Sequence, residues 1–185
     1  MARVPYPDPA KLLPETQEAL GKIAPLNIFR MLAGGEGLMP AFLKLGNYIL
    51  FKSKLDPILR EIAIIRVGVL SKAKYEVHQH ERIGRDLGMS EALIEAMHKG
   101  PDHPALNEMQ RLVMRYTDDV VLNVRASDAT FKPLMERLSL QEMHELMITI
   151  GFYMMVSRFL ETYDIQIEAP GTAGVKFPDS QKRST

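Results

Sequence analysis

Three side chains in the first half of the chain have the chemistry for proton transfer: Glu61, Glu76 and His80. Glu76 and His80 are four residues apart, so on a helix they lie on the same face, one turn apart. An imidazole titrates near neutral pH, and a neighbouring carboxylate shifts the pKa of both groups. We therefore expect His80 to be a general acid or base. Glu76 would either hold one tautomer of the imidazole or carry the proton itself.

Each of these residues also has a structural interpretation. His80 could be a core histidine with a satisfied hydrogen bond. Glu61 could pair with an arginine inside the protein, for example Arg66 or one from another helix, because an unpaired buried charge is costly. Tyr75 could offer its hydroxyl to a pocket as a further catalytic group, or it could be a packed aromatic side chain.

A metal site is the remaining chemical interpretation of Glu61, Glu76 and His80. Two carboxylates and one imidazole suit several metals. Their spacing matches no specific metal motif, however, so we expect neither a metal nor another cofactor. The expected partner is a small-molecule substrate.

The segment 60–88 must position these residues, and it is predicted to form two helices joined by a short polar turn at Ser71 and Lys72. The first helix, 58–70, is apolar nearly all round, which predicts that it is buried. The second, at about 73–87, has a core-facing stripe at helical spacing. A short connection packs two helices side by side. We therefore expect Glu61 to meet Glu76 and His80 at one small, mostly apolar pocket in the centre of a helical bundle.

The rest of the chain also favours helices, and no segment has a convincing strand pattern. Further helices are expected at 14–23, 26–32, 40–51, 92–97, 107–122, 127–137 and 140–163. The proline-rich residues 1–13 predict an extended arm, because proline disfavours a helix interior. Residues 14–167 should form one helical domain, and residues 168–185 a flexible C-terminal tail.

Composition limits the function. The chain has 185 residues, enough for one domain with a sizeable core. Lys and Arg number 23 and so do Asp and Glu, so no net charge favours nucleic acid or an acidic membrane surface. Cysteine is absent, which leaves no thiol chemistry. No apolar run is long enough to span a membrane, and the N-terminus lacks the core of a signal peptide, so a cytoplasmic location is expected.

The segment around Glu61 resembles the core motif of the carboxymuconolactone decarboxylase family, which includes the alkylhydroperoxidase AhpD-like proteins. That motif has a Glu on a buried helix, a Cys-x-x-Cys at the start of the next helix, and a His four residues later. On this chain the Glu falls on Glu61 and the His on His80, while the cysteine positions fall on Ala73 and Glu76. Residues 25–30, 75–76 and 149–153 also look like a branch of the family that lacks the cysteines.

The resemblance implies an all-α, single-domain AhpD-like bundle that assembles as a homo-oligomer, either a dimer, a trimer or a hexamer. The apolar last helix and the proline-rich arm agree with assembly, because exposed apolar faces are usually covered by a partner.

Three functions are compatible with these features. The first is a cofactor-independent lyase, decarboxylase or isomerase that acts on a small organic acid or lactone. The second is an alkylhydroperoxidase-like protein that has lost its thiols. Such a protein could not reduce peroxides by thiol chemistry, which needs a thiolate nucleophile. The third is a non-catalytic binding or scaffold protein.

Overall fold

The computed structural model describes residues 2–35, 37–178 and 181, and within these ranges the regular structure is entirely helical. The expected all-α fold is therefore confirmed. The elements are η1 (Pro9–Lys11), α1 (Pro14–Gly21), α2 (Asn27–Leu32), α3 (Leu38–Phe51), α4 (Pro57–Leu70), α5 (Lys74–Asp86), α6 (Glu91–Lys99), α7 (Glu108–Asn123), α8 (Asp128–Met135) and α9 (Leu140–Tyr163). No described helix is long and apolar enough to cross a membrane.

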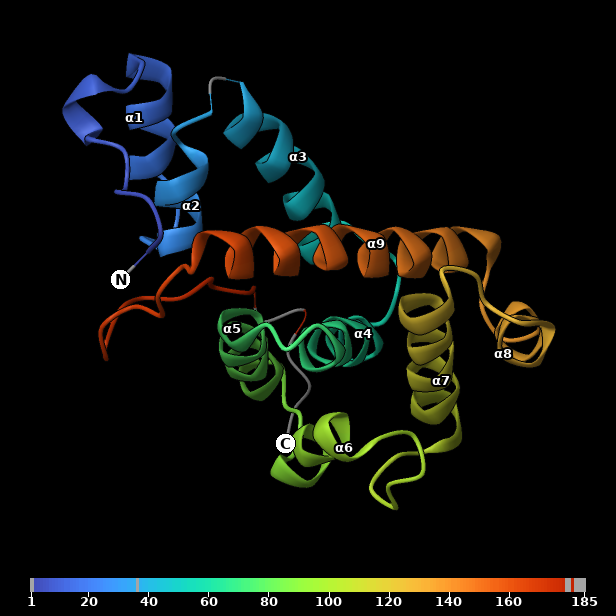
Figure 1. Cartoon of the computed structure of the whole chain (residues 1–185). Coiled ribbons are helices and arrows are strands. Elements are labelled where there is room, and N and C mark those ends of the chain that lie inside the picture. The colour runs from blue at the N-terminus through green and yellow to red at the C-terminus, as the bar shows by residue number, and fades with distance from the viewer. Residues whose placement is uncertain (1, 36, 179–180, 182–185) are drawn as a thin grey trace.

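Helix α4 is the centre of the bundle. The Asp56 side chain caps its start by accepting hydrogen bonds from the backbone N–H groups of Ile58 and Leu59, and Pro57 occupies the first turn. Every residue from 58 to 68 is buried, because α5, α6, α7 and α9 all contact this helix. Figure 1 shows α4 nearly end-on, with α5 and α7 on its two sides and α9 crossing over it.

The turn between α4 and α5 brings the two helices into close contact. Lys72 adopts a left-handed conformation with φ of 56°, and the Ala73 N–H donates to the carbonyl of Gly68. A methyl group at Gly68 would lie 3.0 Å from Val77 Cγ2 and 3.2 Å from Glu76 Cγ. The glycine therefore allows the first turn of α5, which carries Glu76, to lie directly against α4.

The long helix α9 connects the central helices to the N-terminal helices. It begins with a capping box between Ser139 and Glu142. The buried Glu145 on α9 accepts hydrogen bonds from Ser53 Oγ and from the backbone N–H of Leu55, in the loop before α4. Figure 1 shows α1, α2 and α3 on the opposite side of α9 from α4 and α5.

Both ends of the chain lie against the domain where the structure describes them. In the N-terminal arm, the Arg3 N–H donates to the carbonyl of Tyr163 at the end of α9. In the C-terminal segment, the Thr172 carbonyl accepts from Arg82, and Phe177 is buried. Flexibility of the tail stays a prediction, and its residues 179–180 and 182–185 lie outside the described ranges.

Candidate active site

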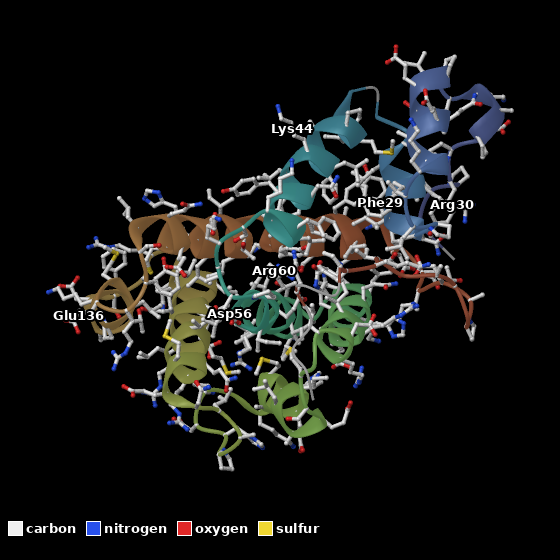
Figure 2. All side chains as sticks on the ribbon, turned by 180° about the vertical axis from the view of Figure 1, so that it is seen from behind. Phe29, Arg30, Lys44, Asp56, Arg60 and Glu136 are labelled. Carbon is white, nitrogen blue, oxygen red and sulfur yellow. The ribbon has the colours of Figure 1, made fainter. Side chains whose placement is uncertain are left out.

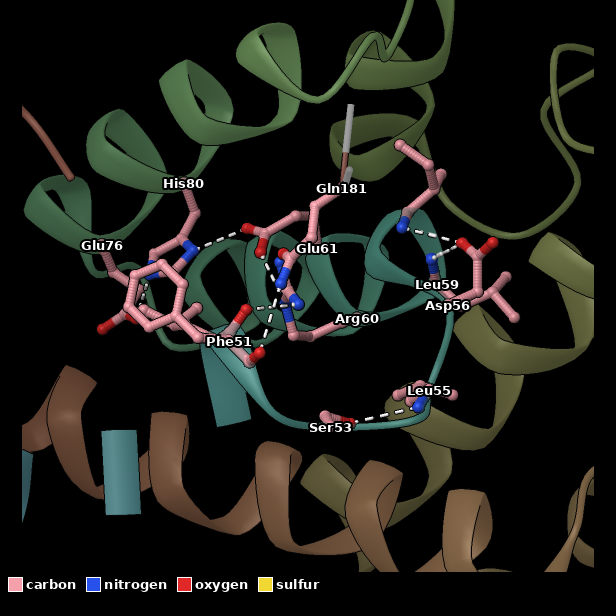
Figure 3. A network of polar contacts seen from close by, with 12 residues as sticks. Phe51, Ser53, Leu55, Asp56, Leu59, Arg60, Glu61, Glu76, His80 and Gln181 are labelled. Carbon is pink, nitrogen blue, oxygen red and sulfur yellow. Dashed lines mark hydrogen bonds and ion pairs between the residues drawn. The ribbon is translucent and has the colours of Figure 1, made fainter. Parts of the chain in front are cut away.

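His80 is held by a buried carboxylate from the neighbouring helix. Its Nδ1 lies 2.7 Å from Oε2 of Glu61, whose residue is 0% exposed. An ionised carboxylate can only accept hydrogen bonds, so Nδ1 carries a hydrogen and donates it. The Nε2 atom is then directed away from Glu61 and towards Glu76, as Figure 3 shows.

Arg60 is the second hydrogen-bond partner of Glu61. Its Nε donates to Glu61 Oε1 at 3.0 Å, and its Nη1 donates to the carbonyl of Leu50 at 2.9 Å. Burial by itself raises the pKa of Glu61, but its interactions with His80, followed by those with Arg60, outweigh it and leave the pKa below its ordinary value. Glu61 therefore pairs with an arginine, as predicted, but this arginine lies on the same helix and not on another one.

The specific alternative of Arg66 is wrong. Its guanidinium forms a bidentate ion pair with Asp118 on α7, with Nε–Oδ1 and Nη2–Oδ2 distances of 2.5 and 2.8 Å. Helix geometry explains the difference, because Arg66 is directed towards α7 whereas Glu61 is directed towards α5.

Glu76 lies on the other side of His80 and has a different environment. Its residue is 2% exposed, its Oε2 contacts Ser157 Oγ at 3.4 Å, and its Oε1 has no hydrogen-bond partner among the described residues. Burial raises the pKa of Glu76 well above its ordinary value; the Ser157 hydroxyl lowers it, and the charge of Glu61 raises it further. Burial therefore favours the protonated form of Glu76.

Glu76 and His80 are in loose contact. Glu76 Oε1 and His80 Nε2 are 3.7 Å apart, which is longer than a hydrogen bond. A carboxyl oxygen and an imidazole nitrogen thus face the same space, so one small chemical group can contact both.

That space is a cavity of about 780 Å³, larger than the small pocket expected from the sequence. It lies between α2, α3, α5, α9 and the C-terminal segment, and Glu76 and His80 are part of its wall. Glu61 lies behind His80 and does not line it. Most of the wall is apolar, with Phe29, Leu43, Phe42, Ile83, Phe152 and Val156 among its residues.

Tyr75 also lines the cavity, but its hydroxyl is bound. It donates to Glu168 Oε1 at 2.5 Å, and Gln79 Nε2 donates to the other carboxylate oxygen at 2.5 Å. The Asn27 backbone N–H donates to Glu168 as well. Burial, followed by the hydrogen bond and charge of Glu168, raises the pKa of Tyr75 far above its ordinary value. This arrangement favours a role in anchoring the C-terminal segment over a role in chemistry.

Two residues at the site were not among the expected catalytic residues. The Tyr153 ring, on α9, meets the His80 ring edge-on, with centroids 4.7 Å apart and an interplanar angle of 83°. Arg60, the second of these residues, pairs with Glu61. Tyr153 lies in the segment 149–153, so the family resemblance was the one signal for it. Its contact with His80 depends on how α9 crosses α5.

A match to a protein family covers the segment that carries this site. Residues 36–101 match the model of the carboxymuconolactone decarboxylase family, a stretch that includes Glu61, Glu76 and His80. The expected resemblance to this family is confirmed. No curated protein sequence matches the chain.

Solved structures with an AhpD-like core have the same fold. An uncharacterized peroxidase-related protein from Ralstonia eutropha JMP134, described as an alkylhydroperoxidase AhpD core, is 16% identical over 90% of this chain and 92% of that chain, with a TM-score of 0.77. An uncharacterized peroxidase-related protein from Silicibacter sp. TM1040 is 20% identical over 90% and 91%, with a TM-score of 0.76.

A third similar structure is that of the debrominase Bmp8 in complex with 2,3,4-tribromopyrrole. It is 19% identical over 83% of this chain and 81% of that chain, with a TM-score of 0.68. At these identities the three structures establish the AhpD-like fold of this protein and leave its activity open.

Proposed function

We propose that this protein is a cofactor-independent acid–base enzyme: a lyase, decarboxylase or isomerase that acts on a small organic acid or lactone. The observation that carries the proposal is that two buried carboxyl groups flank His80 with pKa values shifted in opposite directions. The pKa of Glu61 is lowered, which favours its ionised form, and that of Glu76 is raised, which favours its protonated form. Environments that push the pKa values of neighbouring groups apart are typical of catalytic acids and bases.

In the proposed mechanism, Glu61 fixes His80 with its hydrogen on Nδ1, so that the lone pair of Nε2 faces the cavity. Nε2 removes a proton from a carbon next to a substrate carbonyl, while Glu76 donates its proton to the carbonyl oxygen. The product is an enol, an imidazolium stabilised by Glu61 and an ionised Glu76. In a substrate with a conjugated double bond this enol is a dienol, and an isomerisation is completed when the imidazolium returns its proton to the far carbon and the enol hydroxyl returns its proton to Glu76.

Decarboxylation of a β-keto acid would use the same groups. The bond between the carboxylate and the α-carbon breaks, CO₂ leaves, and the electron pair forms an enolate. Glu76 protonates the enolate oxygen, and the resulting enol tautomerises to the ketone. Both reactions need only the proton donor and acceptor that face the cavity.

The two alternatives differ in what they require. Thiol-dependent peroxide reduction needs a thiolate, and the 185 residues include no cysteine. A non-catalytic binding protein would use the same cavity without turnover. Measurement of turnover with a bound ligand therefore separates binding from catalysis.

The test uses phenylpyruvate and benzoylacetate as probes, with NMR detection of deuterium incorporation next to the carbonyl of the first and of CO₂ loss from the second. We expect His80→Ala and Glu76→Gln each to lower the rate by about 10²- to 10⁴-fold. His78→Ala is the matched control, because His78 is exposed on the same helix, and it should keep the wild-type rate. Saturable binding of both probes with no rate above buffer would favour the binding protein.

A further inference from the structure

Most of the charged residues that line the cavity are positive. Three lysines line it, Lys22, Lys52 and Lys176, whereas Glu76 is the one acidic residue among its described lining residues. Burial also favours the uncharged form of Glu76. The cavity therefore carries an excess of positive charge, although the chain as a whole has none.

Two of these lysines are free to bind an anion. Lys22, at the end of α1, forms an ion pair with Glu18. Lys52, which follows α3, and Lys176, in the C-terminal segment, are exposed, and neither forms an ion pair within the part of the chain that the structure describes.

The C-terminal segment holds Lys176 at the cavity. The next residue, Phe177, is buried, with its ring 5.1 Å from the Phe51 ring and 5.5 Å from the Arg60 guanidinium carbon. Earlier in the segment, Arg82 donates to the Thr172 carbonyl at 3.0 Å. The backbone before and after Lys176 is thus attached to the domain, which keeps this lysine in the wall of the cavity.

The remaining wall is suited to an apolar ligand. Phenylalanines from α2, α3 and α9 line it together with leucine, isoleucine and valine side chains. A volume of about 780 Å³ is within the usual range for pockets that enclose a ligand of several rings or a branched chain. A ligand that matches all of these features combines an apolar body with one anionic group.

We propose that the cavity binds a monocarboxylate with an aromatic or branched apolar body, and that Lys52 and Lys176 bind its carboxylate. Only one part of this inference rests on the proposed function, namely that a carbonyl of the bound molecule would reach Glu76 and His80. Recognition of the carboxylate by the lysines stands on the cavity alone.

The test is calorimetric titration with 4-phenylbutyrate and its neutral amide, 4-phenylbutanamide, which share the same apolar body. Wild-type protein should bind the carboxylate more tightly. Exposed charge pairs are weak, so we expect each of Lys52→Gln and Lys176→Gln to weaken carboxylate binding about two- to fivefold, and the double variant about tenfold. Binding of the amide should not change.

Lys44→Gln is the matched control. Lys44 is an exposed lysine on α3, two turns before Lys52, and it does not line the cavity. Figure 2 shows it on the outer edge of the molecule. This variant removes the same charge and should bind both compounds as the wild type does.

The inference is overturned if 4-phenylbutyrate does not bind, if the amide binds equally well, or if Lys44→Gln weakens binding as much as the cavity variants do. Its failure is distinct from failure of the proposed function. Binding that depends on the lysines but gives no turnover would contradict only the proposed catalysis. Turnover and binding that are unchanged in the Lys52→Gln and Lys176→Gln variants would contradict only this inference.

Discussion

Two glutamates on neighbouring helices have pKa values shifted in opposite directions because of the groups that surround each carboxyl. Glu61 accepts hydrogen bonds from Arg60 and from His80, which offset its burial. Glu76 has only the Ser157 hydroxyl at 3.4 Å, so its burial is not offset. The sequence predicted that Glu76 and His80 lie together, since four-residue spacing fixes this on a helix. It did not predict that Glu61 is the hydrogen-bond partner of His80, because that depends on how α4 and α5 pack.

The raised pKa of Glu76 predicts a specific pH dependence of stability. The unfolded chain releases the Glu76 proton near the ordinary pKa of 4.5, whereas the folded protein retains it to higher pH. Above that value, the free energy of unfolding of the wild type should fall relative to Glu76→Gln by about 1.4 kcal/mol per pH unit, until the folded-state pKa is reached. Urea unfolding of both proteins across this range measures the difference. A difference that is constant with pH would show that Glu76 titrates normally.

Tyr75→Phe tests whether the Tyr75 hydroxyl is structural. The change removes its hydrogen bond to Glu168 while the aromatic ring is retained. Since hydrogen bonds to charged groups contribute about 1.5–3 kcal/mol, we expect a stability loss of that order with little change in catalytic rate. Urea unfolding measures the stability loss, and the deuterium-exchange assay measures the catalytic rate. A rate reduced a hundredfold in a protein of wild-type stability would instead make Tyr75 a catalytic residue.

At the scale of elements, the pair α4 and α5 was predictable and the C-terminal segment was not. The apolar run before Ser71 and the cap at Asp56 indicate a buried helix with a defined start, and the structure has it at Pro57–Leu70. The segment around Phe177 has no periodicity, so its contacts with Phe51 and Arg60 have no signal in the sequence.

Gly68 tests the close contact of these two helices. An added methyl group would lie 3.0 Å from Val77 Cγ2, tighter than an ordinary contact, so Gly68→Ala should push α5 away from α4. We expect a loss of about 1–3 kcal/mol in the free energy of unfolding, together with reduced catalytic rate, because Glu76 moves with α5.

Gly46→Ala is the control for this change. Gly46 is also a buried glycine within a helix, but an added methyl group there would lie 3.6 Å from the Phe152 ring, an ordinary contact. The free energy of unfolding of the Gly46→Ala variant should stay the same or rise by up to about 1 kcal/mol, because alanine has the better helix propensity. Equal destabilisation by both variants would mean that Gly68 has no special role in packing.

At the scale of the whole molecule, α3 and α9 leave an apolar face uncovered. Leu45 and Tyr48 on α3 and Ile148 and Met155 on α9 are all exposed, and the Tyr48 hydroxyl donates to Glu145 on α9. A contiguous exposed apolar surface is usually an interface. We therefore propose that this face mediates the homo-oligomer expected from the sequence.

Light scattering tests the assembly. The wild type should have a mass that is a multiple of 20.9 kDa, and the double variant Ile148→Glu with Met155→Glu should fall to the monomer mass, because each carboxylate would be desolvated in the interface. Leu122→Glu with Val124→Glu is the control, since these exposed apolar residues lie at the end of α7. A monomeric wild type, or an unchanged mass for the α9 variant, would contradict this interface.

The central claim is that Glu76 holds a proton beside His80 at neutral pH while Glu61 does not. Infrared spectroscopy detects the C=O stretch of a protonated carboxyl group directly and needs no substrate. At pH 7 we expect this band in the wild type and in Glu61→Gln, and we expect Glu76→Gln to lack it. A wild-type spectrum without the band, or a band lost in Glu61→Gln and retained in Glu76→Gln, would contradict the assignment of acid and base on which the proposed mechanism depends.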